Sequence, residues 1–287
     1  MSLINRFIAS LVIFLACSAS AIAVADQATV KPALWKIQHQ GTTSYLFGSI
    51  HIGSQSWYPL PKHINQAYEQ SSVLAVELNT LAHGLAVQAA MSLPAGQSLQ
   101  QKISSETFAK LADFSSQYGI PVDTFNGMKP WAAATVAAVL PYMKQGLLPQ
   151  FGIDMHFINA AGIANKPIVE FETVEFQLGM LEQVFSDEAA FVEVLDTPSV
   201  AAIDMVKHWL AGDMKEIAQL TNEQMTPQQL ELILIKRNHD WLAKLKAILA
   251  NNKSHFVVVG AAHLAGRHGL PALLKAQGVN VERVKGF

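Results

Sequence analysis

The sequence predicts an α/β protein built on a central, mostly parallel or mixed β-sheet that is flanked by helices. Short apolar runs rich in β-forming residues recur along the chain, and several are apolar on both faces, as buried parallel strands are. These runs gather near the two ends of the 287-residue chain, with one more in the middle, and the stretches between them have helical spacing. We therefore expect one α/β domain over residues 26–287, with a large helical insertion at about residues 81–162 and 173–250.

Six strands are expected from the apolar runs. The first two flank His39-Gln40-Gly41-Thr42, which is typical of a β-hairpin turn. The third has no polar residue before Glu77, as expected for a central parallel strand. In chain order the expected strands are Leu34–Gln38, Thr43–Ile50, Val73–Leu78, Lys166–Glu172, Phe256–Val259 and Val279–Val284.

Proline and capping residues mark several helix starts. Pro61, Pro130 and Pro227 each stand where a first helical turn is expected, a position that proline favours. Thr226 to Gln229 form a capping box, which predicts the start of a long helix that ends near Leu249. The expected helices are 61–71, 105–118, one that begins at 130, 151–161, 227–249 and 271–276.

The first 25 residues are predicted to be a secretory signal rather than part of the fold. Arg6 is the only charged residue before Asp26, an apolar run follows it, and Ala23-Val24-Ala25 supplies the small residues of a cleavage site. An uncleaved membrane anchor and a lipidated N-terminus at Cys17 are the alternatives. The predicted location is the bacterial periplasm or the extracellular space, and the mature chain would have no cysteine and no membrane span.

The composition excludes several functional classes. A net charge of −2 and a pI of about 6.5 argue against a nucleic-acid-binding protein, which normally presents a basic face. With 51% apolar and 15% charged residues, the chain is not disordered. It contains no phosphate-binding Walker loop, no dinucleotide-binding Gly-x-Gly-x-x-Gly and no Gly-x-Ser-x-Gly nucleophile elbow.

Two Gly-x-x-His sequences carry the most informative chemistry. Gly48 and Gly260 end predicted strands, and His51 and His263 follow at the strand ends, where open α/β sheets bind ligands. Glu77 lies at the end of a third strand. Three such imidazole and carboxylate groups can hold zinc, manganese, cobalt or iron and leave a position open for water. A lone Gly-x-x-His is nevertheless a weak motif, and a histidine at a strand end is more often a capping or packing residue.

Four other charged residues are candidates to line the same site. Asp154 shares a predicted helix with His156. Glu170 and Glu172 alternate along one strand and share a face, which either lines the site or is a solvated strand end. Arg237, in the long helix, could pair with one of these acids or face solvent.

Several stretches, in this order and spacing, match a known family: Tyr45–Gly53, Leu74–Leu78, Lys129–Trp131, Gly152–Asp154, Lys166–Thr173, Arg237-Asn238 with Trp241, and Val259–Leu264. In them the chain resembles the TraB/GumN family, to which the Tiki metalloproteases are related. The resemblance implies a hydrolase fold with a divalent metal (manganese, cobalt or zinc) at His51 and His263. Glu77 would be a third ligand or the general base. Peptide cleavage is an activity of the Tiki branch.

Two functions remain open at this level. The first is an exported metal-dependent peptidase that acts on a peptide or protein substrate. The second is a non-catalytic periplasmic protein of the same family that binds a peptide or regulates a surface process. Retention of His51, His263 and Glu77 favours the enzyme, because a pure binder does not need all three.

Overall fold

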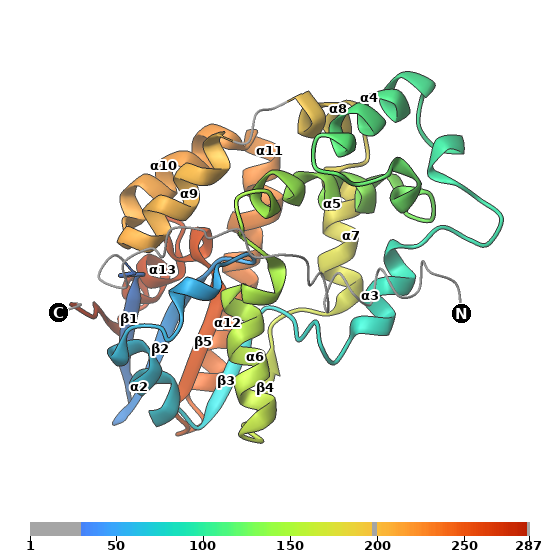
Figure 1. Ribbon diagram of the computed structural model, residues 1–287. Coiled ribbons are helices and arrows are strands. Elements are labelled where there is room, and N and C mark those ends of the chain that lie inside the picture. Colours follow the sequence, from blue (N-terminus) through green and yellow to red (C-terminus); the bar gives the residue numbers. More distant parts are fainter. Residues whose placement is uncertain (1–29, 197–199, 286–287) are drawn as a thin grey trace. The chain divides into compact units, whose positions relative to one another are not determined.

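A computed structural model describes residues 30–196 and 200–285 of the chain. The predicted signal, residues 1–25, lies outside the described residues. The chain forms two compact units. As far as they are described, residues 21–79, 148–172 and 201–287 form the unit that contains the β-sheet, and residues 80–147 and 173–200 form a helical unit (Figure 1). Both units are interrupted in sequence, because the chain passes from one to the other more than once.

The sheet has six strands in the order β4-β3-β5-β2-β1-β6. Strands β4, β3, β5 and β2 run parallel, whereas β1 pairs antiparallel with β2 and with β6. The sheet is therefore mixed, and the predicted fold class is confirmed. The strands are β1 (Leu34–His39), β2 (Thr42–Ser49), β3 (Val73–Val76), β4 (Ile168–Glu170), β5 (His255–Gly260) and β6 (Asn280–Arg283).

The β1–β2 hairpin and the β2–β5 pair bring distant parts of the chain together. Gln40 and Gly41 both have positive φ, 46° and 79°, as in the tight turns that match strand twist, so the predicted hairpin is confirmed. Strands β2 and β5 are parallel neighbours, with Gly48 opposite Val259. The two Gly-x-x-His sequences therefore leave the sheet side by side at its carboxyl edge.

Apolar side chains that alternate along the strands build a core on each face of the sheet. On one face, Leu46 and Val257 pack in a buried cluster with Trp241 and Leu245 of helix α12. On the other face, the rings of Phe47 and Phe256 contact Phe157 of helix α6 at 5.7 and 4.8 Å between centroids. Because both faces are covered, the carboxyl edge is the part of the sheet left for a site.

The helices of the sheet unit include one long run with an unusual segment. Helix α11 continues through a π-helical segment, Glu231–Ile235, directly into α12, so the predicted helix 227–249 is present but not regular throughout. Their bounds are α2 (Lys62–Gln70), α6 (Ile153–Ile163), α9 (Val200–Ala211), α10 (Met214–Gln224), α11 (Pro227–Leu230), α12 (Lys236–Leu249) and α13 (Leu270–Ala276). A short 3-10 turn, η7 (Ala261–Leu264), follows β5.

The helical unit contains no named strand among its described residues. Its helices are α3 (Gly84–Met91), α4 (Ser105–Ser116), α5 (Pro130–Met143), α7 (Val174–Val184) and α8 (Glu188–Asp196). Glu188 of α8 accepts a hydrogen bond from the backbone N–H of Ser104, at the start of α4. In the part of the chain that the structure describes, no helix is long and apolar enough to cross a membrane.

Three strands are shorter than the sequence predicts, and one of them is β6, which covers Asn280–Arg283 rather than 279–284. β3 ends at Val76 rather than Leu78, and β4 covers Ile168–Glu170 rather than 166–172. Two more backbone hydrogen bonds continue beyond the ladder, from Phe171 to Val76 and from Glu172 to Glu77. The chain then enters α7 at its capping residue Thr173, which ends the pairing.

Candidate active site

The carboxyl edge of the sheet gathers side chains from four neighbouring parallel strands. Glu172 follows β4, Glu77 follows β3, His263 follows β5 and His51 follows β2. The backbone hydrogen bond from Glu172 to Glu77 sets the first two side by side. The strand order thus places these groups at one edge of the sheet, the position expected from the sequence. Their chemical roles stay predictions.

Arg237, from the first turn of α12, lies at the centre of this edge. Its Nε and one Nη2 hydrogen donate to the two carboxylate oxygens of Glu172, at 2.7 and 2.9 Å. Nη2 also donates to Glu77, at 2.5 Å. Nη1 contacts the backbone carbonyl of Ile233 at 3.0 Å and Nε2 of His263 at 3.1 Å. All five guanidinium hydrogens thus have an acceptor, which fixes the group in position.

The protonation of His263 follows from its partner Asn238. The Asn238 amide nitrogen donates to the backbone carbonyls of His263 and His268, at 3.2 and 2.7 Å, so its oxygen is left as the acceptor. That oxygen lies 2.7 Å from Nδ1 of His263, which must carry the hydrogen. Nε2 of His263 then presents its lone pair to Arg237. Burial lowers the pKa of His263 to about 3, which agrees with a neutral ring.

Nearby charges and burial together determine the ionisation state of Glu77 and Glu172. Burial acts to raise the pKa of Glu77, but interactions with His263 and the Arg237 guanidinium outweigh it and lower the pKa to about 2. Burial raises the pKa of Glu172 above its ordinary value, against the opposing effect of Arg237. With both carboxylates ionised, the two acids and the arginine carry a net charge of −1 in a buried environment. Trp241 also donates its ring N–H to Glu172, at 3.0 Å.

His51 stands apart from this buried cluster and faces solvent. Its side chain is 71% exposed, and its Nδ1 lies 2.8 Å from the carboxylate of Asp154 in α6. The charge of the Asp154 carboxylate and its hydrogen bond raise the pKa of His51 to about 9. No hydrogen bond joins Nε2 of His51 to another described residue. The ring is therefore held by one nitrogen and presents the other.

Two glycines allow α6 to bring Asp154 to His51. A Cβ at Gly152 would lie 2.4 Å from the backbone oxygen of His51, and a Cβ at Gly53 would lie 2.0 Å from that of Phe151. Only residues without a side chain permit this approach of the two backbones. The backbone N–H of Ile153 also donates to the carbonyl of Ile50, at 3.0 Å. The start of α6 is thus fastened to the loop that carries His51.

A pocket of about 240 Å³ joins these groups. It is lined by side chains of the cluster and by residues of α9, the π-helical segment and η7: Ser49, Ile50, His51, Glu77, Met205, Trp209, Ile233, Arg237, Gly260, Ala261, Ala262 and His263. Trp209 is fixed by a hydrogen bond from its ring nitrogen to the carbonyl of Gly48, at 2.8 Å. The pocket combines an exposed imidazole, a buried cation and apolar walls, a combination typical of ligand sites.

The remaining sequence candidates occupy different positions. Gly260 lines the pocket, and its N–H donates to Glu77 at 2.7 Å. A Cβ at Gly48 would lie 3.1 Å from Cα of Ala261, so this glycine allows η7 to pack on β2. Glu170 accepts a hydrogen bond from the backbone N–H of Asn79 at 2.7 Å and lines no part of this pocket. Asn238 lies in a stretch that matches the family, but its sequence context did not identify it as a candidate site residue.

The three expected metal ligands do not fit a divalent ion in this arrangement. Nε2 of His263 and one oxygen of Glu77 face the Arg237 guanidinium, and the other oxygen of Glu77 accepts from Gly260. His51 alone presents a ring nitrogen without such a partner. Across the described residues, no group of three or more His, Cys, Asp or Glu side chains is arranged to hold a metal ion. The Arg237 guanidinium occupies the positions beside His263 and Glu77 that a divalent ion would need.

Comparison with known proteins places the chain in a family. The model of the TraB/PrgY/gumN family matches residues 33–283. The chain belongs to this family. It is 29% identical to YbaP of Shigella flexneri over 236 residues, which are 81% of this chain and 88% of that protein, and 28% identical to YbaP of Escherichia coli strain K12 over 80% and 87%. Both relatives are named as uncharacterized proteins.

More distant relatives carry a functional name. The chain is 23% identical to metalloprotease TIKI1 of Danio rerio over 89% of this chain and 64% of that protein. It is also 23% identical to metalloprotease TIKI2 of Xenopus tropicalis, over 90% and 60%. No solved structure matches the chain. The family resemblance predicted from the sequence is confirmed.

Proposed function

We propose that this chain is an exported hydrolase that cleaves peptide or protein substrates in the pocket lined by His51 and Arg237. The observation that carries the proposal is the His51–Asp154 pair at the edge of that pocket. A carboxylate holds one ring nitrogen, and the other nitrogen is left to exchange a proton with a bound molecule. The kinship with metalloproteases named TIKI1 and TIKI2 supports the same reaction class.

The residues of the pocket have separable roles in this proposal. Water attacks the carbonyl carbon, protonated His51 gives its proton to the leaving amine nitrogen as the C–N bond breaks, and the neutral ring then takes a proton from the new carboxylic acid. Asp154 orients the ring of His51.

Arg237 holds the buried carboxylates of Glu77 and Glu172 in position behind the pocket, and its hydrogens are committed to protein acceptors. The three groups together carry a net charge of −1, which favours the protonated ring of His51 nearby. Trp209 and Ile233 line the pocket with apolar surface.

The family resemblance implies that the activity depends on manganese, cobalt or zinc. Bound at such a site, a divalent metal would polarise a carbonyl and activate water. The contacts of Arg237 with Glu77 and His263 oppose this expectation. The proposed reaction therefore uses the chain's own groups, and the assay below tests whether added metal changes the rate of cleavage.

A peptide-release assay tests the proposed function. The purified mature chain is incubated with a mixed peptide library after chelator treatment, with and without added Mn²⁺, Co²⁺ or Zn²⁺, and products are identified by mass spectrometry. We expect cleavage that is lost in His51→Ala and reduced in Asp154→Asn. His239→Ala, which removes an exposed histidine two residues from Arg237, is the matched control and should retain activity.

Absence of cleavage under every metal condition would overturn the hydrolase proposal in favour of a peptide-binding or regulatory protein. Export is tested separately by N-terminal sequencing of protein from the periplasmic fraction. The expected mature chain begins near Asp26. A chain that begins at Met1, or a lipidated N-terminus at Cys17, would contradict the predicted signal.

A further inference from the structure

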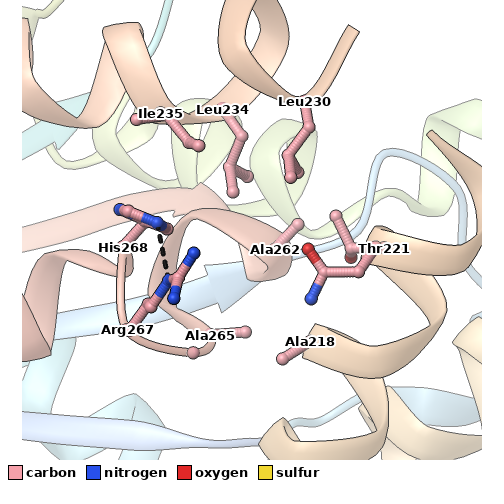
Figure 2. Close-up of a pocket in the computed structure, with 11 residues that line it drawn as sticks. Ala218, Thr221, Leu230, Leu234, Ile235, Ala262, Ala265, Arg267 and His268 are labelled. Atoms are coloured by element: carbon pink, nitrogen blue, oxygen red, sulfur yellow. Dashed lines mark hydrogen bonds between the residues drawn. The ribbon is translucent and has the colours of Figure 1, made fainter. Parts of the chain in front are cut away.

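A second and larger pocket lies beside the candidate active site, with a volume of about 480 Å³. Figure 2 shows Leu230 and Leu234 pointing into it from above, Ala218 of α10 from the side, and Ala262 and Ala265 from the turn after β5. These five side chains are apolar. The volume is within the range of roughly 300–1,000 Å³ that is typical of ligand sites. The pocket can therefore accommodate an apolar side chain.

Arg267 gives this mainly apolar pocket a positive charge. It is exposed, and its Nε donates to Nε2 of His268 at 2.9 Å, so that ring nitrogen acts as an acceptor (Figure 2). No carboxylate is among the residues that line the pocket, and no ion pair joins Arg267 to another described residue. The guanidinium fork therefore has hydrogens available for a ligand, and its geometry matches a carboxylate.

The second pocket shares its walls with the candidate active site. Ala262 lines both pockets. In the π-helical segment, Ile233 lines the active-site pocket and the next residue, Leu234, lines the larger one. Gly266, at φ 67°, turns the chain so that Arg267 follows at the rim. A ligand in the larger pocket would therefore lie next to the residues around His263.

We propose that this pocket binds the C-terminal residue of a peptide, with an apolar side chain against Leu230 and Leu234 and the terminal carboxylate on Arg267. The inference rests on the proposed function for its biological meaning, because it identifies the substrate as a peptide with a free, apolar C-terminus. The pocket matches both halves of that ligand. Apolar side chains make up most of its lining, beside the polar Thr221 and Asn222, and among the described lining residues the charged side chain is the cation Arg267.

Peptide binding tests this inference without any need for cleavage. The probe is a hexapeptide with an N-terminal fluorescein and a C-terminal leucine, prepared as the free acid and as the amide, and its affinity is measured by fluorescence anisotropy. We expect the free acid to bind about tenfold tighter than the amide, which corresponds to ~1.4 kcal/mol. The same peptide ending in serine should bind more weakly than the leucine peptide.

Variants assign the preference to this pocket. Arg267→Gln should bind acid and amide equally, whereas Lys215→Gln, which removes an exposed cation from α10 outside the pocket, should keep the tenfold preference. Ala218→Phe should fill the pocket and weaken all the leucine peptides. Thermal melts establish that each variant is folded. Arg267→Gln is informative even if Ala218→Phe fails to fold.

The results separate this inference from the proposed function. No binding of any probe, equal binding of acid and amide by the wild-type chain, or an undiminished preference in Arg267→Gln would overturn the peptide C-terminus site. A preference for the free acid without cleavage would support the site and count against the hydrolase. Cleavage without that preference would support the hydrolase and count against the site.

Discussion

Replacement of Arg237 by glutamine should destabilise the chain because it leaves two buried acids without their cation. The side chains of Arg237, Glu77 and Glu172 are 5%, 7% and 2% exposed. Loss of one partner from a buried ion pair costs about 3–5 kcal/mol, since the remaining charge stays buried. For a chain of this size, ~2–4 °C of melting temperature accompany each kcal/mol, so Tm should fall by roughly 6–20 °C.

Calorimetry of the wild-type chain, Arg237→Gln and a control measures this fall. The control is Lys236→Gln, which removes an exposed cation from the neighbouring position and should leave Tm within about 2 °C, since exposed charges contribute less than ~1 kcal/mol. If Arg237→Gln has the same Tm as the control, the five hydrogen bonds of the guanidinium do not stabilise the folded chain by the expected amount.

The same variant tests whether the guanidinium takes the place of a divalent ion. Without the guanidinium, His263 and Glu77 lose their contacts with Arg237, and their nitrogen and oxygen atoms can bind a metal ion. Added Mn²⁺, Co²⁺ or Zn²⁺ should therefore raise the Tm of Arg237→Gln but not that of the wild-type chain. At 100 times the dissociation constant, the added stability would be ~2.7 kcal/mol. Arg237→Gln combined with His263→Ala should not respond. One equivalent of tightly bound metal in the wild-type chain, purified without chelator, would refute this reasoning.

Three further predictions follow from the site. Because the pKa of His51 is raised to about 9, the charged ring stabilises the folded chain below pH ~6.5, and this stability is lost as pH rises through 9. NMR titration of the His51 ring should show the raised pKa. Asp154→Asn should lower that pKa. Because the pKa of Glu77 is lowered to about 2, its contribution is complete above pH ~4.5 and is lost as pH falls toward 2, so acid unfolding of Glu77→Gln should be less steep in that window. Gly152→Ala would place a Cβ 2.4 Å from the backbone of His51 and should cost about 1–3 kcal/mol in urea unfolding while the pKa of His51 falls; a variant with unchanged stability and pKa would contradict the close approach.

The fold was predictable because its parallel strands contain short apolar runs that lead to a glycine or an acid. Strand identity and the carboxyl-edge position of His51, Glu77 and His263 follow from such local patterns. The partners of these residues do not. Arg237 meets Glu172 across 65 positions and Glu77 across 160, and the spacing of a helix does not reveal which strand end its charged face will contact.

The two acids of β4 show the same limit. Alternation along a strand predicts that Glu170 and Glu172 share a face. The ladder ends at Glu170, and the two side chains bind different partners, the backbone N–H of Asn79 and the Arg237 guanidinium. The Asp154–His51 contact likewise depends on two glycines 99 positions apart, Gly53 and Gly152, whose close backbone approach no single stretch of sequence reveals.

The π-helical segment Glu231–Ile235 sets the rotation of everything that follows it in the long helix. Its wider turn, closed by the hydrogen bond from the backbone N–H of Lys236 to the carbonyl of Glu231, accommodates one residue more than an α-helical turn does. Each residue of an α-helix advances the side-chain direction by ~100°, so deletion of one residue here would swing Arg237 away from the sheet edge by about that angle. The length of this segment, rather than the identity of any one side chain in it, therefore determines whether the two acids receive their cation.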